Sequence, residues 1–343
     1  MGNYAHIFSK FSRKSILVVG DVILDKYIRG CVSRISPEAP VPIVLETESF
    51  YTPGGAANVA HNLHSLGAKV TLIGRIGNDA EGQILLKQFK KNGLSTRGIF
   101  IDRKLPTICK TRVIAQRQQV IRIDREKIGS AGSKDVINRI CKFIGKNISD
   151  FDAVIVSDYG KGLITPELVE CVRTSALEKN KIIIVDPKVE HFGYYRNVTA
   201  ITPNLNEAEN AIRNIKITSK SDEKLNIHSD RLQSDKDIDT AGSELLRYLK
   251  LDVLLITLGE RGMRLFEKGK KPVSITTKAR EVYDVSGAGD AVISAFTLSL
   301  AAGATKRQSA EIANFAGGIV VGKMGAAPVT KKELMMAIAG KTQ

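Results

Sequence analysis

The chain has 343 residues, of which 43% are hydrophobic and 25% are charged, so it can form a full core and is not generally disordered. It contains no run of about 18 apolar residues, no signal-peptide pattern and no CxxC pair, and we expect a soluble cytoplasmic protein with reduced thiols. The net charge of +15 comes from scattered Lys and Arg residues that are not interleaved with aromatics. This pattern argues against nucleic acid and favours anionic small molecules.

Short apolar runs alternate with helical patterns along the chain. We expect buried strands at 15–20, 70–77, 152–158, 181–187, 200–204 and 252–259. Helical periodicity appears between several of them, at 56–67, 79–93 and 165–180. This alternation predicts an α/β fold with a mostly parallel sheet flanked by helices.

Three regions depart from this rhythm. Segments 41–55 and 107–126 alternate as antiparallel strands do, and they predict a small β lid with strands from about 26–50 and 107–126. The segment 212–240 carries six basic and six acidic residues, and we expect a solvated excursion there that leads into a helix at 239–250.

Polar or glycine-rich loops follow five of the predicted strands. They are Asp21, 158–162, 186–188, 202–207 and 257–262. Ligands of an open parallel sheet bind beyond the carboxyl ends of its strands. Any one of these loops is more simply a turn, but five together indicate an active-site rim.

The stretch DVSGAGD, residues 284–290, precedes a strongly apolar helix. The chain has no P-loop, and Val292 stands where a dinucleotide-binding motif needs its third glycine. The N–H groups of Ala288, Gly289 and Asp290 open the helix and can hold a phosphate, while Asp290 can accept a proton from an attacking hydroxyl. Taken alone, the motif would favour an Asp that caps an ordinary helix.

Two further groups of residues offer ligand chemistry. Asn204 and Glu207 carry oxygen atoms suited to Mg²⁺ and its water shell, or they form a helix cap. Gly54 and Gly55, with Asn58 three residues on, let a polyol approach the backbone, or they begin a tightly packed helix.

The stretches GGAANVAHNLHSLGAKVTLIGRIGNDAEG (54–82) and DVSGAGDAVISAF (284–296) resemble the two signature regions of the PfkB, or ribokinase-like, sugar kinases. The resemblance covers essentially the whole chain. It implies one kinase domain over residues 1–343, with a central mostly parallel sheet, a β lid that closes over the sugar, and ATP and Mg²⁺ at the C-terminal edge of the sheet.

The resemblance also implies roles for single residues. Asp290 would be the catalytic base, beside an anion hole of Gly287, Ala288 and Gly289. Residues that would meet ATP are Asn204, Leu205, Asn206, Glu207, Thr257, Gly259, Gly262 and Asn314. Asn204 and Glu207 would reach Mg²⁺ through water. The sugar hydroxyls would be held by Asp21, Gly54, Gly55 and Asn58.

Within the family, GDVILDKYIRG, SRISPEAPVPIV, KTRVIAQRQQVIRID, SDYGKG and VDPK look most like the branch that acts on D-glycero-β-D-manno-heptose 7-phosphate. That branch uses ATP to phosphorylate C1, giving the 1,7-bisphosphate for ADP-heptose and the lipopolysaccharide core. Candidate cations for the 7-phosphate are Arg34, Arg112, Lys161 and Lys188. The alternatives are another acceptor, such as ribose, fructose 1-phosphate, tagatose 6-phosphate or a nucleoside, and a catalytically silent scaffold on this fold.

The sequence departs from the family pattern in two ways. Val285 stands where the consensus has Thr, and Ser286 where heptose kinases have Thr, which leaves the catalytic atoms unchanged. The chain ends without the H-x-G-H motif of the nucleotidyltransferase domain to which many heptose kinases are fused. We therefore expect a separate adenylyltransferase later in the pathway, or a longer parent protein.

The expected partners are small molecules and a second copy of the chain. An edge strand such as 41–46 in the lid often pairs with a second subunit, so we expect a homodimer. Neither nucleic acid nor a membrane is expected to bind.

Overall fold

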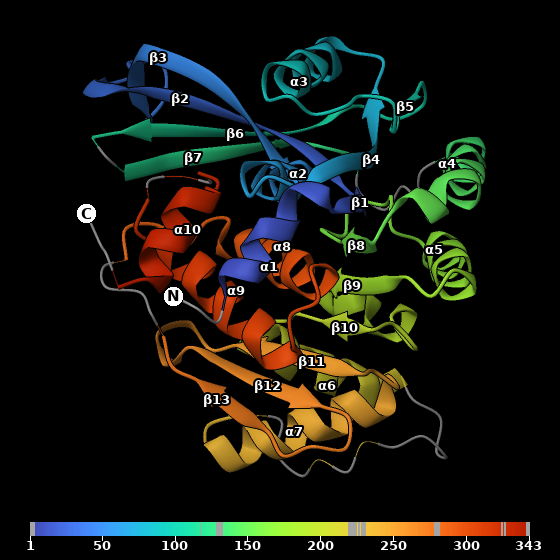
Figure 1. Cartoon of the computed structure of the whole chain (residues 1–343). Coiled ribbons are helices and arrows are strands. Elements are labelled where there is room, and N and C mark those ends of the chain that lie inside the picture. The colour runs from blue at the N-terminus through green and yellow to red at the C-terminus, as the bar shows by residue number, and fades with distance from the viewer. Residues whose placement is uncertain are drawn as a thin grey trace.

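A nine-stranded sheet lies at the centre of the computed structural model, which describes residues 4–116, 118–127, 133–218, 225, 227, 231–277, 282–323, 325 and 327–340 (Figure 1). In spatial order its strands are β13 (Val273–Ile275), β12 (Met263–Glu267), β11 (Val253–Thr257), β10 (Ala200–Ile201), β9 (Ile182–Asp186), β8 (Ala153–Ser157), β1 (Ser15–Gly20), β4 (Lys69–Gly77) and β5 (Ile99–Asp102). Neighbours from β5 to β11 are parallel, whereas β12 and β13 add antiparallel pairs at one edge. The prediction of a mostly parallel sheet is confirmed, and each segment predicted as a buried strand contains one.

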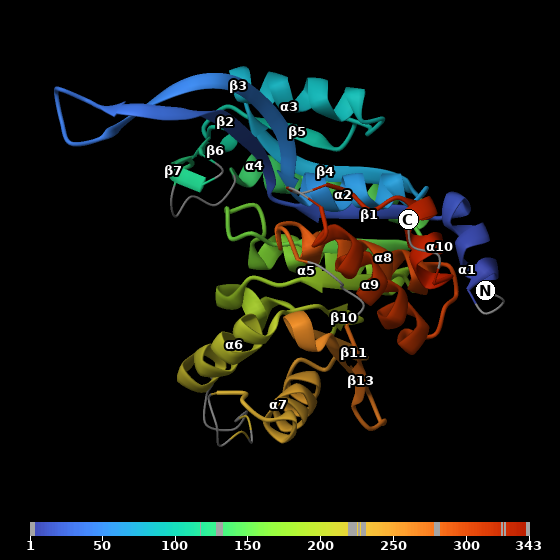
Figure 2. The same ribbon diagram turned by 90° about the vertical axis from the view of Figure 1, so that its left-hand side faces the viewer.

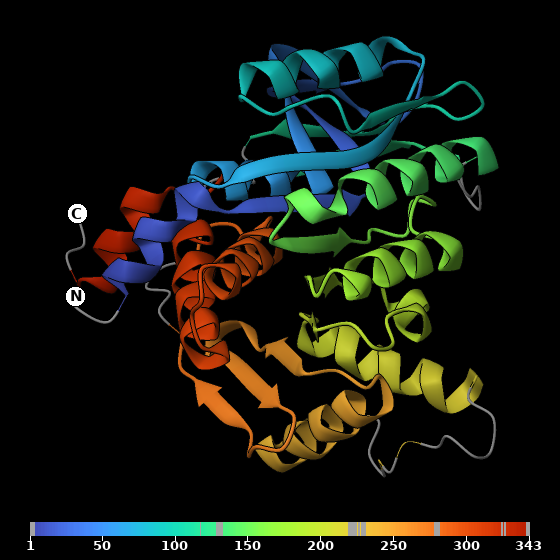
Figure 3. The same ribbon diagram turned by 45° about the vertical axis from the view of Figure 1, so that its right-hand side comes forward.

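Helices cover both faces of this sheet (Figure 3). One face carries α1 (Ala5–Lys10), α2 (Ala56–Ser65), α3 (Ala80–Lys91), α8 (Ala288–Ala301), α9 (Lys306–Val320) and α10 (Lys331–Ile338). The other carries α4 (Lys134–Asn147), α5 (Pro166–Glu178), α6 (Leu205–Thr218) and α7 (Asp235–Tyr248). Short 3₁₀ turns lie at η1 (Phe11–Arg13), η2 (Ile148–Asp150), η3 (Val189–Tyr194) and η4 (Gly259–Arg261). Within the described part of the chain, no helix is both long and apolar enough to cross a membrane.

The central strands are continuous apolar runs because both of their faces are buried. Successive side chains of a strand point to opposite faces, so Ile16 and Val18 of β1 enter the core beneath α8, and Leu17 and Val19 enter the core beneath α5. Neither face of these central strands meets solvent. Their sequences therefore lack the alternation of apolar and polar residues that a half-exposed strand shows.

A second, four-stranded sheet crosses the carboxyl end of the first. Its order is β3 (Pro42–Gly55), β2 (Val22–Ile35), β6 (Ile108–Ala115) and β7 (Gln118–Arg125). The predicted strand pairs are therefore present, although they join through a parallel pairing of β2 with β6. The hairpin of β2 and β3 projects far from the body (Figure 2).

The expectation of a solvated excursion over 212–240 is wrong at both ends of the segment. Helix α6 continues to Thr218, with Ile212 and Ile215 in the core. Beyond it Leu225, Ile227 and Leu232 are also buried, and α7 begins at Asp235. The prediction considered only the charged residues of the segment. Its apolar side chains pack into the core and hold the segment against the sheet. The remainder of the segment, 219–224, 226 and 228–230, lies outside the described residues.

Candidate active site

The DVSGAGD turn leads directly into α8, as the sequence predicts. Gly287 adopts a left-handed conformation, with φ of 78°, and α8 begins at Ala288. The helix packs on α2 and against β8 and β9, which brings Asp290 to the edge where the central strands end. Asp290 is only 6% exposed.

Two donors from distant parts of the chain hold the Asp290 carboxylate. The Tyr159 hydroxyl donates to Oδ1 over 2.6 Å, and Asn58 Nδ2 donates to Oδ2 over 2.6 Å. Burial raises the pKa of Asp290 to about 6, the two hydrogen bonds lower it, and the charge of Asp25 adds to the rise. The result is a carboxylate that is ionised at neutral pH and yet basic enough to take a proton.

The backbone at the start of α8 is open to a ligand in part. The Ala288 N–H donates to Val285 O over 3.3 Å and so closes the turn. Among the described residues, the N–H groups of Gly289 and Asp290 have no acceptor, as expected for a first helical turn. A Cβ placed at Gly289 would meet nothing within 4 Å, so this side of the turn faces open space.

Asp284, the first acid of the motif, stabilises the turn. Its Oδ1 accepts from the Ser286 N–H over 2.9 Å and its Oδ2 from the Gly325 N–H over 3.1 Å. It therefore ties the start of α8 to the loop after α9, and the Arg112 charge helps to lower its pKa.

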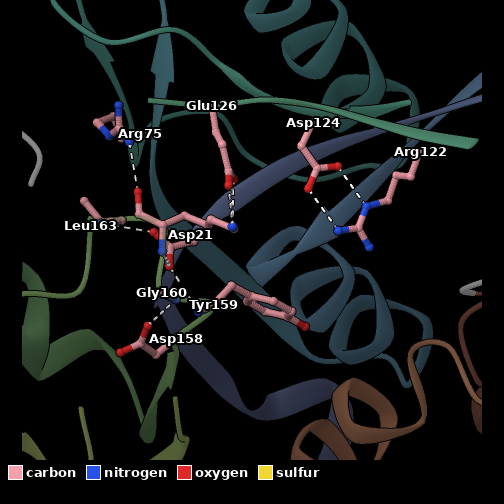
Figure 4. A network of polar contacts seen from close by, with 10 residues as sticks. Asp21, Arg75, Arg122, Asp124, Glu126, Asp158, Tyr159, Gly160 and Leu163 are labelled. Carbon is pink, nitrogen blue, oxygen red and sulfur yellow. Dashed lines mark hydrogen bonds and ion pairs between the residues drawn. The ribbon is translucent and has the colours of Figure 1, made fainter. Parts of the chain in front are cut away.

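The structure places Asp21 in a buried, fully engaged position. Its carboxylate accepts three backbone N–H groups of the loop after β8, from Tyr159 at 3.0 Å, Lys161 at 3.0 Å and Leu163 at 3.1 Å (Figure 4). Asp21 is 1% exposed, and burial raises its pKa. It organises the loop that carries Tyr159, and each of its carboxylate oxygens accepts at least one backbone N–H group.

Asp25, four residues further along, lies at the open side of the same cleft. It forms an ion pair with Arg112 of β6, and its charge acts on both Asp290 and Tyr159. A Cβ at Gly54 would lie 2.1 Å from Asp25 Oδ2, and one at Gly55 would lie 2.4 Å from Asp21 O. The two glycines thus make room for these acids, and Asp25 is a site residue that the sequence assignments omitted.

The proposed cations are only partly brought together. Lys110 of β6, which is outside the candidate set, feels two of the candidates: burial lowers its pKa, the charge of Asp25 raises it, and the charges of Lys161 and Arg112 lower it. Lys161 also pairs with Glu126 over 2.7 Å. Arg34, in contrast, is exposed on the outer part of β2, opposite Ile43, nine strand positions from Asp25, a span of roughly 30 Å.

Lys188 lies between the loop after β8 and the start of α6. A Cβ at Gly160 would meet the Lys188 side chain at 3.2 Å, and the Lys188 charge lowers the pKa of Glu207. It therefore faces the proposed nucleotide end of the cleft more closely than the lid.

Asn204 and Glu207 cap α6 through reciprocal hydrogen bonds. Glu207 N donates to Asn204 Oδ1 over 2.9 Å, and Asn204 N donates to Glu207 Oε2 over 2.8 Å. Burial raises the pKa of Glu207. Of the neighbouring assigned residues, Leu205 is half-buried, Asn206 is exposed, and Thr257 pairs with Asn204 across the sheet edge.

The field around this cap suits a hydrated cation. Burial raises the pKa of Asp186 well above its ordinary value, and the charges of Asp290, Glu207 and Asp158 raise it further. Within the described ranges, no three His, Cys, Asp or Glu side chains gather closely enough to bind a metal directly. Carboxylates such as Glu207 and Asp186 would suit a cation that keeps most of its water shell, as Mg²⁺ does.

The remaining nucleotide candidates lie around β11 and β13. Gly259 and Gly262 both have positive φ, 61° and 86°, and a Cβ at Gly262 would collide with Ile275 O at 2.0 Å. Asn314 of α9 is 5% exposed and donates to Thr276 O over 2.6 Å. Asn314 thus fixes the chain that follows β13, and its side chain is already engaged.

Comparisons with known proteins agree with this arrangement. The model of the pfkB family carbohydrate kinases matches residues 13–333. The bifunctional protein HldE of Desulfatibacillum aliphaticivorans is 41% identical over 95% of this chain and 63% of its own length. That of Helicobacter pylori is 39% identical over 95% of this chain and 66% of its own length. The chain therefore spans less than two thirds of these relatives.

Solved structures show the same fold at low sequence identity. Phosphofructokinase-2 from Escherichia coli superposes with a TM-score of 0.74 at 17% identity, over 96% of this chain and 99% of that one. Arabidopsis thaliana ribokinase, complexed with ribose and ATP, superposes with a TM-score of 0.71 at 17% identity, over 95% of this chain and 98% of that one. The predicted ribokinase-like fold is confirmed.

Proposed function

The chain belongs to the pfkB family of carbohydrate kinases, and from that premise we propose that it phosphorylates C1 of D-glycero-β-D-manno-heptose 7-phosphate with ATP. The observation that carries the proposal is the setting of Asp290. A buried carboxylate with a pKa of about 6 lies at the head of a helix whose Gly289 and Asp290 N–H groups have no acceptor among the described residues. Base and phosphate donor site are thus adjacent.

In the proposed reaction each group has one task. Asp290 takes the proton from the C1 hydroxyl as that oxygen attacks the terminal phosphorus of ATP, and the bond from this phosphorus to its bridging oxygen breaks to release ADP. The N–H groups of Gly289 and Asp290 stabilise the charge that builds on the transferred phosphoryl group. Tyr159 and Asn58 hold the carboxylate in the orientation that the attack needs.

ATP and Mg²⁺ occupy the other half of the cleft in this proposal. Mg²⁺, when bound, neutralises charge on the phosphates of ATP, and Asn204, Glu207 and Asp186 hold its water shell. Thr257, Gly259 and Gly262 line the nucleotide, whose adenine lies on the side of Asn314.

A phosphorylated acceptor is supported by the cations near the lid. Lys110, Arg112 and Lys161 lie near the Asp25 end of the site, where Arg112 pairs with Asp25 and Lys161 with Glu126, and an acceptor phosphate would share these cations with the two acids. The resemblance of several lid and loop motifs to heptose 7-phosphate kinases agrees with this assignment. The product would then enter ADP-heptose and lipopolysaccharide core synthesis.

The proposal extends to location and partners. A cytoplasmic site fits the use of ATP, and adenylyl transfer to the product would follow on a separate adenylyltransferase or on another part of a longer chain. We also propose a homodimer, formed through the lid.

A panel of acceptors tests the proposal, with ADP release as the measurement. Heptose 7-phosphate is expected to give the highest kcat/KM, and Asp290→Asn is expected to lower kcat by roughly 100- to 10,000-fold with saturating substrates. Preference for ribose, fructose 1-phosphate or tagatose 6-phosphate would reassign the acceptor. Near-normal turnover by Asp290→Asn would show that Asp290 is not the base. The absence of turnover with every acceptor would favour a catalytically silent scaffold.

A further inference from the structure

Two asparagines of α2, Asn58 and Asn62, are buried one helical turn apart. Asn58 is 2% exposed and Asn62 is 0% exposed. Residues four apart share one face of a helix, and this face of α2 meets the start of α8 and the segment before α10. A buried side-chain amide is costly unless both of its ends are hydrogen-bonded, so its partners indicate its role.

The Asn62 amide is bonded at both of its ends. Its Oδ1 accepts the Val329 N–H over 3.0 Å. Its Nδ2 donates to Asn58 O over 3.0 Å and lies 3.5 Å from Asn58 Oδ1. A backbone N–H only donates and a backbone carbonyl only accepts, so these two partners fix which end of the Asn62 amide is oxygen and which is nitrogen.

The orientation of Asn62 in turn fixes that of Asn58. Because the Asn62 nitrogen lies on one side, the Asn58 amide turns its oxygen to that side, where a second NH₂ group would be repelled. The Asn58 nitrogen is then left to donate to Asp290 Oδ2, which it does over 2.6 Å. The hydrogen bonds therefore run in one direction, from the Val329 N–H through the two amides to the carboxylate.

This direction matters because a free amide can serve either form of an acid. It donates through its nitrogen to a carboxylate, or it turns over and accepts through its oxygen from a protonated carboxyl group. A hydrogen bond to the charged form favours ionisation, whereas a hydrogen bond to the neutral form opposes it. Held in one orientation, Asn58 stabilises only the ionised form of Asp290.

Given the proposed role of Asp290 as the base, we propose that Asn62 is a positioning residue, which keeps the Asn58 nitrogen turned toward Asp290 and prevents that amide from turning over. Asn62 acts through Asn58, whose nitrogen makes the contact with the carboxylate. Through the Val329 N–H, the segment before α10 becomes part of the support of the base.

Other groups that act on Asp290 come from several elements. Tyr159 of the loop after β8 donates to it, and the charge of Asp25 on β2 raises its pKa. On β9, the pKa of Asp186 is raised first by burial and then by the Asp290 charge. On α2, burial lowers the pKa of His61, which is therefore neutral at pH 7. The strand β8 and the C-terminal half of α9 carry no titratable side chain.

Carbon-13 NMR of the aspartate carboxyl groups, in the whole protein without substrates, tests the proposal. The Asp290 resonance is identified by its loss in Asp290→Asn, and a pH titration gives its pKa. Asn62→Leu is close to asparagine in size and frees the Asn58 amide, so Asp290 should titrate roughly 0.5 to 1 unit higher than in the wild type. An unchanged pKa in a folded Asn62→Leu protein would overturn the proposal.

Asn62→Ser provides the same test if Asn62→Leu fails to fold. A serine hydroxyl in a helix bonds the carbonyl four residues back, so the bond to Asn58 O can be kept. Its single proton is then used, and no donor faces Asn58 Oδ1. We expect the same rise in the Asp290 pKa, and melting temperatures show which variants fold. A wild-type pKa in Asn62→Ser would also contradict the proposal.

Ser294→Ala is the matched control. Ser294 is also 0% exposed, and its hydroxyl joins α8 to α2 by donating to Val59 O over 3.2 Å. Because this bond does not lead to the carboxylate, its loss should lower the melting temperature and leave the Asp290 pKa unchanged. An equal rise in this variant would assign the effect to a general loosening between α8 and α2, against the proposal.

A double-mutant cycle shows whether the effect passes through Asn58. Asn58→Leu removes the donor itself and should raise the Asp290 pKa by roughly 1 unit. If Asn62 acts through Asn58, adding Asn62→Leu should raise that pKa no further. A second rise as large as that of the single variant would exclude this route.

The titration is independent of the proposed reaction, because it needs neither sugar nor nucleotide. If Asp290 is the base, the acidic limb of the kcat/KM profile should move with the pKa that NMR measures in Asn62→Leu. A limb that stays in place while the NMR pKa rises would remove Asp290 as the base and leave the role of Asn62 intact.

Discussion

At the scale of single residues, the site depends on how one buried carboxylate is kept usable. Burial alone would protonate Asp290, and the hydrogen bonds from Tyr159 and Asn58 oppose that effect. Tyr159 cannot replace the base as an anion, because burial and the Asp290 charge raise its own pKa well above the ordinary value. It therefore remains a donor throughout the working pH range.

Tyr159→Phe should move the acidic limb of the pH profile to higher pH. The base works only when deprotonated, so kcat/KM falls as the pH drops through the pKa of Asp290, about 6. Loss of one donor to the carboxylate raises that pKa by roughly 1 unit. Tyr194→Phe, which removes a hydroxyl from a ring stacked on His191, is the control and should keep the wild-type profile. An unchanged profile in Tyr159→Phe would show that the hydroxyl does not tune the base.

Residue-level prediction is most specific where a motif is continuous in sequence. The signature regions located Asp290 and Asn58 but not the 2.6 Å contact between them. Tyr159 lies 131 positions from Asp290, and only the folded sheet edge brings the two together. Asp21 and Asp25 both follow β1, and the sequence alone could not tell which is buried by the loop after β8.

At the scale of elements, α6 begins with a cap that would also serve a metal. The reciprocal bonds of Asn204 and Glu207 explain why the helix starts there, whether or not Mg²⁺ is bound. We expect the same two side chains both to cap the helix and to bind the water shell of Mg²⁺. Substitutions can separate the two roles.

Asn204→Ser should keep the helix and lose the metal function. Serine is as good an N-cap as asparagine, so the free energy of unfolding should stay within about 0.5 kcal/mol of the wild type, whereas Asn204→Ala should lose about 1 kcal/mol. If Asn204 also orders the water shell of Mg²⁺, both variants should need more Mg²⁺ for half-maximal rate. Chemical denaturation and Mg²⁺ titration of the rate measure the two effects. Wild-type Mg²⁺ dependence in Asn204→Ser would restrict Asn204 to capping.

Element prediction worked best where burial is two-sided. Continuous apolar runs identified the central strands, because nothing but a doubly covered sheet accounts for them. The same reasoning failed over 212–240, where isolated apolar residues such as Leu225 and Leu232 bury themselves between charged neighbours. The parallel pairing of β2 with β6 is set by chain crossing and has no local signature.

At the scale of the whole molecule, the lid exposes several large apolar side chains. Ile35, Leu45, Ile121 and Ile123 are each more than half exposed. They lie on the four-stranded sheet, whose outer hairpin stands away from the body (Figure 2). Such a surface is typical of one that pairs with another copy.

Light scattering coupled to size exclusion should find a homodimer. Leu45→Glu should dissociate it, because a charge would be buried at the contact. Leu177→Glu, on an exposed apolar residue of α5 away from the lid, should leave the dimer intact. A wild-type protein with the mass of a single chain across micromolar concentrations would contradict the expectation.

The single residue between β1 and β2 has a mechanical consequence. Asp21 joins the two sheets, and its backbone N–H and carbonyl bond to Ser157 O and the Ala56 N–H while its carboxylate grips the loop after β8. The hairpin of β2 and β3 is therefore fixed at the end nearest Asp21. The first irregularity in its pairing comes between Arg29 and Gly30. We expect bending to be confined to the part of the hairpin beyond that bulge. Amide hydrogens near residues 22–24 should then exchange far more slowly than those at the tip. Asp25 should keep its position when the tip moves.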